Sequence, residues 1–177
     1  YTGIVLVEKP LFKRCLVLSP LPFRQTFIGY NLRFHPVIQR LKALLEGERI
    51  LSVLAYVGQY LPDWRPASDY RASYSASAEQ GGGVLRDLSH ELDYLIWILG
   101  GGGRVAALGG HFSALEITSD DVFALMLVTP ACPVVTLQLN YLDRAARRFV
   151  LINTARHTIE ADLISGTITV DRDRESY

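Results

Sequence analysis

The stretch Gly81-Gly82-Gly83-Val84-Leu85-Arg86-Asp87-Leu88-Ser89-His90-Glu91-Leu92-Asp93 decides the fold, because a glycine cluster runs directly into a helical pattern. At about 100° per residue, seven apolar side chains fall within an arc of about 120°: Val84, Leu85, Leu88, Leu92, Leu95, Ile96 and Leu99. The glycines at 100–103 stop such a helix, since glycine takes the left-handed conformation at a helix C-terminus without steric cost. We therefore predict one helix over residues 84–99 whose apolar arc faces the core.

The opposite side of this predicted helix carries Asp87, His90, Glu91 and Tyr94. Asp87 and His90 are neighbours at i,i+3 spacing, where a carboxylate can orient an imidazole. Histidine supplies a base whose pKa lies near neutrality, and a carboxylate fixes its tautomer. Two interpretations stay open: a catalytic pair, or the solvated face of an ordinary amphipathic helix.

A short apolar run near the start, Ile4–Val7, lies between Gly3 and Pro10. It is typical of a strand buried on both faces, as in parallel sheets covered by helices. The residues after it do not alternate strand and helix as a parallel sheet requires, and no G-x-G-x-x-G motif occurs. We expect the chain to be the C-terminal part of a longer protein.

Most of the remaining pattern predicts strands. We expect a helix from residue 36 to about residue 46, ended by Gly47. Strands are predicted at 27–30, 50–60, 105–113, 122–128, 134–143, 149–153, 158–163 and 167–170. Runs of strands joined by short turns form antiparallel sheets. Within 134–141 one face is apolar and the other is mixed, which predicts a sheet with helices on one face and solvent or another subunit on the other.

Three motifs in order resemble the Gfo/Idh/MocA family of NAD(P)-dependent oxidoreductases. They are Glu8-Lys9-Pro10 after an apolar strand, Tyr30-Asn31-Leu32-Arg33-Phe34-His35-Pro36, and the helix with Gly-Gly-Gly, Asp, His and Asp in sequence. The resemblance runs from Glu8 to about Ile168. It implies that residues 1–22 are the last strand and linker of a Rossmann domain. Residues 23–177 would be an α+β substrate-binding and oligomerisation domain with a large, mostly antiparallel open sheet.

The same resemblance implies roles for individual residues. Lys9 would be the catalytic lysine beside the nicotinamide, with Asp87 and His90 completing the site. The Glu8-Lys9-Pro10 loop would contact NAD or NADP, which is held mainly by the missing domain. Many family members place three residues between that Asp and His, whereas only Leu88 and Ser89 intervene here.

The chemistry asks for these residue types independently. Oxidation of a secondary alcohol removes a proton from oxygen while hydride leaves carbon, so a base and a cation near the developing alkoxide both lower the barrier. The hydride acceptor must be a cofactor, because no side chain does that work.

The segment 60–75 is rich in Trp, Tyr and Arg and has no regular apolar period, which predicts a loop. Aromatic faces stack on sugar rings, and arginines bind carboxylates or phosphates. The candidate substrate-binding residues are Trp64, Arg65, Tyr70 and Arg71, together with Tyr30, Asn31 and Arg33. The alternative is a surface loop packed by its own side chains. The loop and the Asp-Leu-Ser-His at 87–90 are similar to a family branch that acts on sugars of cell-surface glycans.

Composition narrows the function classes. Over 177 residues, 18 basic residues balance 18 acidic ones, which argues against a nucleic-acid or membrane-surface partner. No apolar run approaches the roughly 20 residues that span a bilayer, and no secretory signal opens the chain. Cys15 and Cys132 have no metal-like spacing, so we expect reduced thiols, a cytoplasmic protein and no metal.

We therefore expect the catalytic and substrate-binding half of an NAD(P)-dependent oxidoreductase that acts on a secondary alcohol or ketone of a sugar or nucleotide sugar. It should be inactive alone and form a dimer or tetramer through the open sheet face. The alternatives are a non-enzymatic sugar-binding or dimerisation module with the same fold, and a metal-dependent hydrolase.

Overall fold

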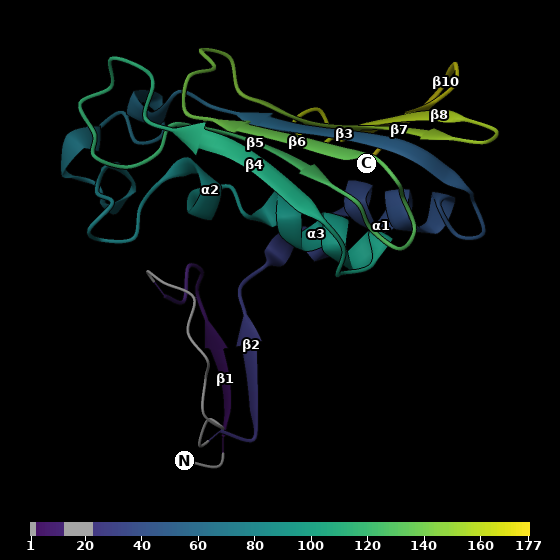
Figure 1. The fold of residues 1–177 in the computed structure, drawn as a ribbon, viewed down its shortest axis with the longest axis horizontal. Coiled ribbons are helices and arrows are strands. Elements are labelled where there is room, and N and C mark those ends of the chain that lie inside the picture. Colours follow the sequence, from purple (N-terminus) through teal and green to yellow (C-terminus); the bar gives the residue numbers. More distant parts are fainter. Residues whose placement is uncertain (1–2, 13–22) are drawn as a thin grey trace.

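The computed structural model describes residues 3–12 and 23–177. Its main body is one large sheet with α1, α2 and α3 below it, and a small two-stranded sheet lies beneath those helices (Figure 1). This arrangement confirms the predicted α+β class with a large, mostly antiparallel open sheet. Along the described part of the chain, none of the helices is both long and apolar enough to cross a membrane.

The large sheet has the strand order β10-β9-β8-β7-β3-β6-β5-β4. Only the central pair β3 and β6 is parallel, while every other neighbouring pair is antiparallel. The strands are β3 (Ile50–Gly58), β4 (Val105–Gly110), β5 (Val122–Leu127), β6 (Val135–Asn140), β7 (Arg147–Thr154), β8 (Thr158–Asp162), β9 (Thr167–Val170) and β10 (Asp173–Ser176). All but β10 lie where the sequence predicts a strand.

The inner face of the sheet forms the core with the helices. Alternate residues of β6 at 135, 137 and 139 are at most 1% exposed, as the period-2 pattern predicts. Helix α1 (Pro36–Leu44) begins with proline and contacts β8 and β9, while α3 (His90–Leu99) contacts β3. Gly47, with φ +76°, follows the end of α1. Short 3₁₀ helices lie at η1 (Asn31–Phe34), η2 (Leu61–Asp63), η3 (Tyr70–Ala72) and η4 (Tyr74–Ala76).

The outer face of the sheet is not covered by helices (Figure 1). Antiparallel partners share a face, so Leu108 beside Ala124 and Ala106 beside Met126 point outward together. Leu54 is 39%, Leu108 76% and Met126 61% exposed. The mixed composition predicted for this face is therefore present in the structure.

The prediction for the strand at Ile4–Val7 is wrong in one respect. Strand β1 forms, but Ile4 is 62% and Leu6 67% exposed rather than buried. The reason is that, among the described residues, β1 pairs with β2 (Gln25–Ile28) alone, in parallel, so that its side chains are largely exposed. The predicted domain boundary after residue 22 falls between these two paired strands and stays a prediction. Cys15 and most of the predicted linker lie outside the described residues.

The prediction of one helix over residues 84–99 is also wrong. Helix α2 (Val84–Asp87) ends after one turn, and α3 starts at His90. The buried residues of α2 and α3, at 84, 87, 88, 91, 94, 95 and 99, lie on one continuous face. That face is rotated from the predicted apolar arc, so Glu91 and Tyr94 from the predicted polar face are fully buried. Ile96, predicted for the core, is 44% exposed.

Candidate functional site

The site predicted from sequence lies where the small sheet meets the junction between α2 and α3. Lys9 follows strand β1, and its Nζ donates a hydrogen bond to the backbone carbonyl of Asp87. The carbonyl oxygen of Arg86 lies 3.5 Å from the same Nζ. The structure therefore places the ammonium of Lys9 against the last backbone carbonyls of α2, three and four residues before His90.

The helix breaks at this point because its first turn is fixed by tertiary contacts. Gly83 adopts φ +120°, and the N–H groups of Val84 and Leu85 donate to the backbone carbonyl and the side chain of Asp120, at 2.9 and 3.0 Å. At the other end, the Ser89 hydroxyl donates to the Arg86 carbonyl at 2.8 Å. These contacts hold α2 and the start of α3 as separate turns.

Asp87 faces the sheet and not His90. Its side chain is buried, and its Oδ2 accepts a hydrogen bond of 2.6 Å from the hydroxyl of Tyr141, just after β6. Burial raises the pKa of the Tyr74 hydroxyl, and the nearby charge of Asp87 raises it further. The hydrogen bond expected between Asp87 and His90 is not formed, because the break removes the helical i,i+3 geometry. A catalytic role for Asp87 stays a prediction.

His90 lies in a partly buried position with its Nδ1 enclosed and unpartnered by any described residue. Burial lowers its pKa to about 4, and the positive charges of Lys9 and Arg148 add to this effect against the opposing charge of Asp93. The imidazole is therefore neutral near pH 7. The ring of Tyr30 stands edge-on to it, with 5.6 Å between ring centroids.

The other candidates from the 30–36 stretch are placed less uniformly. The Tyr30 hydroxyl lies 3.3 Å from Ser89 Oγ, beside the site. Arg33 donates two hydrogen bonds of 2.7 and 2.6 Å to the carboxylate of Asp93, so its guanidinium is committed to α3. Asn31, at the start of η1, is exposed.

The predicted substrate loop is only partly connected to this site. The Trp64 ring stands edge-on to Tyr141 at 5.2 Å, which links the loop to Asp87. A small pocket is lined by Leu61, Trp64, Arg65, Ser68, Tyr70, Ser73 and Ser75. Arg71, in contrast, is exposed and pairs with Asp69 and Glu116 at 2.9 and 3.1 Å. Part of the loop is thus packed by its own side chains.

Two charged residues near the site were missed as candidates. Glu91 is fully buried in the first turn of α3, and Arg148 Nε lies 2.9 Å from its Oε1. Arg148 occurs in phase with Val150 and Ile152, which are buried on the inner face. The sequence does contain a signal for this pair, because an arginine at an inward position of a strand is buried only if an acidic side chain pairs with it.

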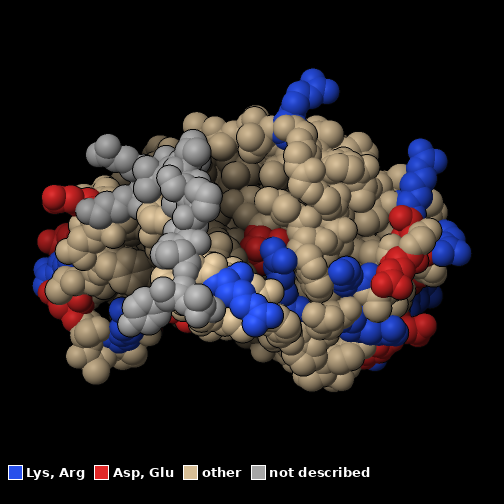
Figure 2. Space-filling model, turned by 90° about the horizontal axis from the view of Figure 1, so that it is seen from below, with Lys and Arg blue, Asp and Glu red and all other residues tan. Residues whose placement is uncertain are grey.

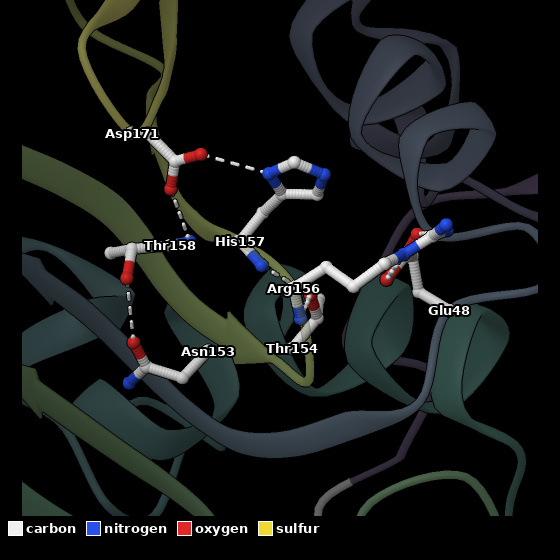
Figure 3. A network of polar contacts seen from close by, with 7 residues as sticks. All are labelled: Glu48, Asn153, Thr154, Arg156, His157, Thr158 and Asp171. Atoms are coloured by element: carbon white, nitrogen blue, oxygen red, sulfur yellow. Dashed lines mark hydrogen bonds and ion pairs between the residues drawn. The ribbon is translucent and has the colours of Figure 1, made fainter.

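Figure 2 shows the helix-bearing face, where basic side chains lie around a small recessed acidic surface. Within the described ranges, no group of three or more His, Cys, Asp or Glu could hold a metal ion. A further polar network joins the turn between β7 and β8 to two neighbouring turns (Figure 3). His157 Nδ1 lies 2.8 Å from Asp171, and Arg156 pairs with Glu48. This network contains none of the predicted site residues.

Comparison with known proteins gives a consistent result. The family model described as GFO/IDH/MocA C-terminal domain matches residues 38–160. No curated protein matches the chain. Among solved structures, an oxidoreductase from Thermotoga maritima matches with a TM-score of 0.72 and 16% identity, over 86% of this chain and 46% of its own.

Two further solved structures are dehydrogenases. UDP-N-acetylglucosamine 3-dehydrogenase from Acidithiobacillus ferrooxidans has a TM-score of 0.63 and 17% identity, over 85% of this chain and 45% of its own. Levoglucosan dehydrogenase, solved with NADH and levoglucosan, has a TM-score of 0.69 and 19% identity, over 81% of this chain and 42% of its own. The chain thus spans less than half the length of these three structures.

Proposed function

The chain belongs to the GFO/IDH/MocA family, and from this membership we propose that it is the catalytic and substrate-binding part of an NAD(P)-dependent oxidoreductase. The proposed substrate is a secondary alcohol or ketone of a sugar or nucleotide sugar, as the names of two structural neighbours suggest. The observation that carries the proposal is the hydrogen bond from the Lys9 ammonium to the backbone carbonyl of Asp87, three residues before His90.

In this proposal His90 is the proton acceptor and Lys9 stabilises charge. The neutral imidazole takes the proton from the substrate hydroxyl through whichever ring nitrogen the substrate reaches. The ammonium of Lys9 stabilises the developing alkoxide, since it is partly withdrawn from water. Asp87 acts on the same site through its backbone carbonyl, which receives Lys9, and through the charge of its carboxylate, which favours the ammonium form.

The residues present fit a nicotinamide in part. The enclosed His90 nitrogen and the Lys9 ammonium suit the reacting end, and Glu8, Lys9 and Pro10 would lie along it. When bound, the nicotinamide supplies the hydride acceptor. The sequence has no G-x-G-x-x-G loop for a pyrophosphate. We therefore propose that residues 1–22 end a Rossmann domain of a longer cytoplasmic protein, and that residues 1–177 alone are inactive.

The walls of the proposed substrate site come from two segments. Tyr30 borders His90, and Trp64, Arg65 and Tyr70 line the pocket that reaches Tyr141. A sugar ring would stack on such aromatic faces. Arg33 and Arg71 already hold carboxylates of this chain, so they would act on substrate only after releasing them.

The open outer face of the sheet is the proposed contact with a second copy of the chain. Its exposed side chains at 54, 108 and 126 are large and apolar. Grouped exposed apolar side chains on a soluble domain are typical of interaction surfaces.

The catalytic proposal is tested with Lys9→Ala and His90→Ala in the complete protein, assayed with NAD(P)⁺ against UDP-sugars and free sugars. Loss of a general base or of a charge beside an alkoxide lowers kcat by roughly 10²- to 10⁴-fold. The affinity for NAD(P)H, measured by fluorescence, should change little. Lys42→Ala and His157→Ala are matched controls outside the site. Unchanged kcat in both site variants would remove the proposal.

A further inference from the structure

Glu91 is a buried carboxylate whose compensation is incomplete. Its side chain is 0% exposed. Arg148 Nε lies 2.9 Å from its Oε1, and among the described residues only this guanidinium and the backbone N–H of Glu91 itself act on the carboxylate as hydrogen-bond donors, neither of them well aligned. Transfer of a carboxylate from water into such surroundings is unfavourable unless cations compensate its charge. We therefore expect a second cation near Glu91.

The second cation is Lys9, whose ammonium donates a hydrogen bond to the backbone carbonyl of Asp87, four residues before Glu91. Burial raises the pKa of Glu91 to about 7, while Arg148 and Lys9 both oppose this rise. Tyr94, one turn along α3, also faces the carboxylate, and its buried hydroxyl has no partner among the described residues. Above neutral pH, Glu91 is thus an anion between two cations that come from β7 and from the segment after β1.

The charges around Lys9 come from every element packed against it. Asp87 of α2, Glu91 of α3 and Glu8 of its own segment favour the ammonium, whereas Arg148 of β7 disfavours it. Burial is the largest single influence and lowers the pKa of Lys9. His90 faces the charges of Lys9, Arg148 and Asp93.

These contacts indicate a role for the Glu91 carboxylate in setting the charge state of Lys9. We propose that Glu91 is a positioning residue of the Lys9–His90 site, whose buried carboxylate offsets Arg148 and keeps Lys9 in its ammonium form beside the neutral imidazole. The role deepens the proposed function and rests on it for its meaning in catalysis. The charge relationship itself exists without cofactor or substrate.

The test is a titration of Lys9 by NMR in the 177-residue chain, labelled with ¹³C at the ε carbon of lysine. The sequence has only three lysines, so the spectrum is simple, and each signal is assigned by Lys→Arg substitution. Lys42, whose ammonium lies 3.8 Å from the centroid of the Trp97 ring, is the internal reference. The variants are Glu91→Gln, Arg148→Met and the double variant, with Glu160→Gln as a control at an exposed carboxylate on β8.

Removing a nearby opposite charge shifts a pKa by about one unit or more. Glu91→Gln should lower the Lys9 midpoint by about that amount, Arg148→Met should raise it, and the double variant should return it close to the starting value. Glu160→Gln should leave it unchanged, and Lys42 should not move in any variant. A purely structural role for Glu91 predicts no such opposite signs.

A Lys9 midpoint that stays fixed in Glu91→Gln, or that falls in Arg148→Met, overturns the proposal. If Glu91→Gln does not fold, the direction in Arg148→Met decides alone. The proposed function fails separately, through unchanged turnover of Lys9→Ala, because the titration needs neither cofactor nor substrate.

Discussion

Replacing Tyr141 with phenylalanine is expected to destabilise the fold by about 2 kcal/mol, the typical net value of a hydrogen bond to a charged group. The Tyr141 ring is fully buried, and its hydroxyl donates a 2.6 Å hydrogen bond to Asp87. The variant keeps the ring and its edge-on contact with Trp64. It removes only the donor, so Asp87 loses its bond to β6 inside the core.

Tyr94→Phe is the matched comparison. Tyr94 is equally buried, but its hydroxyl has no hydrogen-bond partner in the described part of the chain. Removing an unsatisfied buried hydroxyl is neutral or stabilising. Urea unfolding followed by circular dichroism should separate the two variants, and Tyr141→Phe should lower the melting temperature by about 4–8 °C in a chain of this size.

The reasoning is refuted if Tyr94→Phe costs as much free energy of unfolding as Tyr141→Phe. That result would mean that the phenols stabilise the core through packing alone. In the complete protein, Tyr141→Phe should also reduce kcat more than Tyr94→Phe does, because only Tyr141 holds the residue whose carbonyl receives Lys9.

Three further predictions concern single groups. The NMR signals of the His90 ring should titrate with a midpoint near pH 4, and this midpoint should rise in Lys9→Met. Because this pKa lies below the ordinary 6.5, His90 contributes stability that is complete above pH 6.5 and is lost as the pH falls toward 4. A midpoint near 6.5 would contradict this. Gly83→Ala should lower the free energy of unfolding by about 2 kcal/mol in urea, because φ is +120° and the new Cβ would lie 2.3 Å from Asp120 Oδ1; an unchanged midpoint would show that the turn can relax. Met126→Glu should shift any dimer toward monomer in sedimentation velocity, since this side chain is 61% exposed on the outer face; an unaffected dimer would place the interface elsewhere.

The strands of the large sheet were predictable because burial on one face imposes a period of two. In β6, alternate residues at 135, 137 and 139 are buried, and a one-residue slip would expose all of them. Strand β10 was missed because its sequence Asp-Arg-Glu-Ser has no apolar alternation. It forms as an edge strand on β9, where the ladder of backbone hydrogen bonds suffices.

The members of the candidate site stay a prediction, and their contacts could not be predicted from the sequence. The spacing of Lys9 and His90 along the chain contains no information about Arg148, which enters from β7 and lies 2.9 Å from Glu91. The angular count placed Glu91 on a solvated face because it centred the buried face on the apolar residues alone. Asp87 and Glu91 are buried with them, since Tyr141 meets the first carboxylate and Arg148 the second.

The break in the helix is what makes the Lys9 contact possible. In a continuous α-helix the carbonyls of residues 86 and 87 would accept from the N–H groups of residues 90 and 91, four positions along. Here the carbonyls of Arg86 and Asp87 are turned toward Lys9, and the Ser89 hydroxyl occupies part of the same group of acceptors. The chain therefore loses the helical hydrogen bonds from the N–H groups of residues 90 and 91. It gains a binding position for the Lys9 ammonium near the His90 imidazole. The shortened spacing between Asp87 and His90 fits this arrangement, because it is the backbone of Asp87 that receives the lysine while its carboxylate anchors the turn to Tyr141.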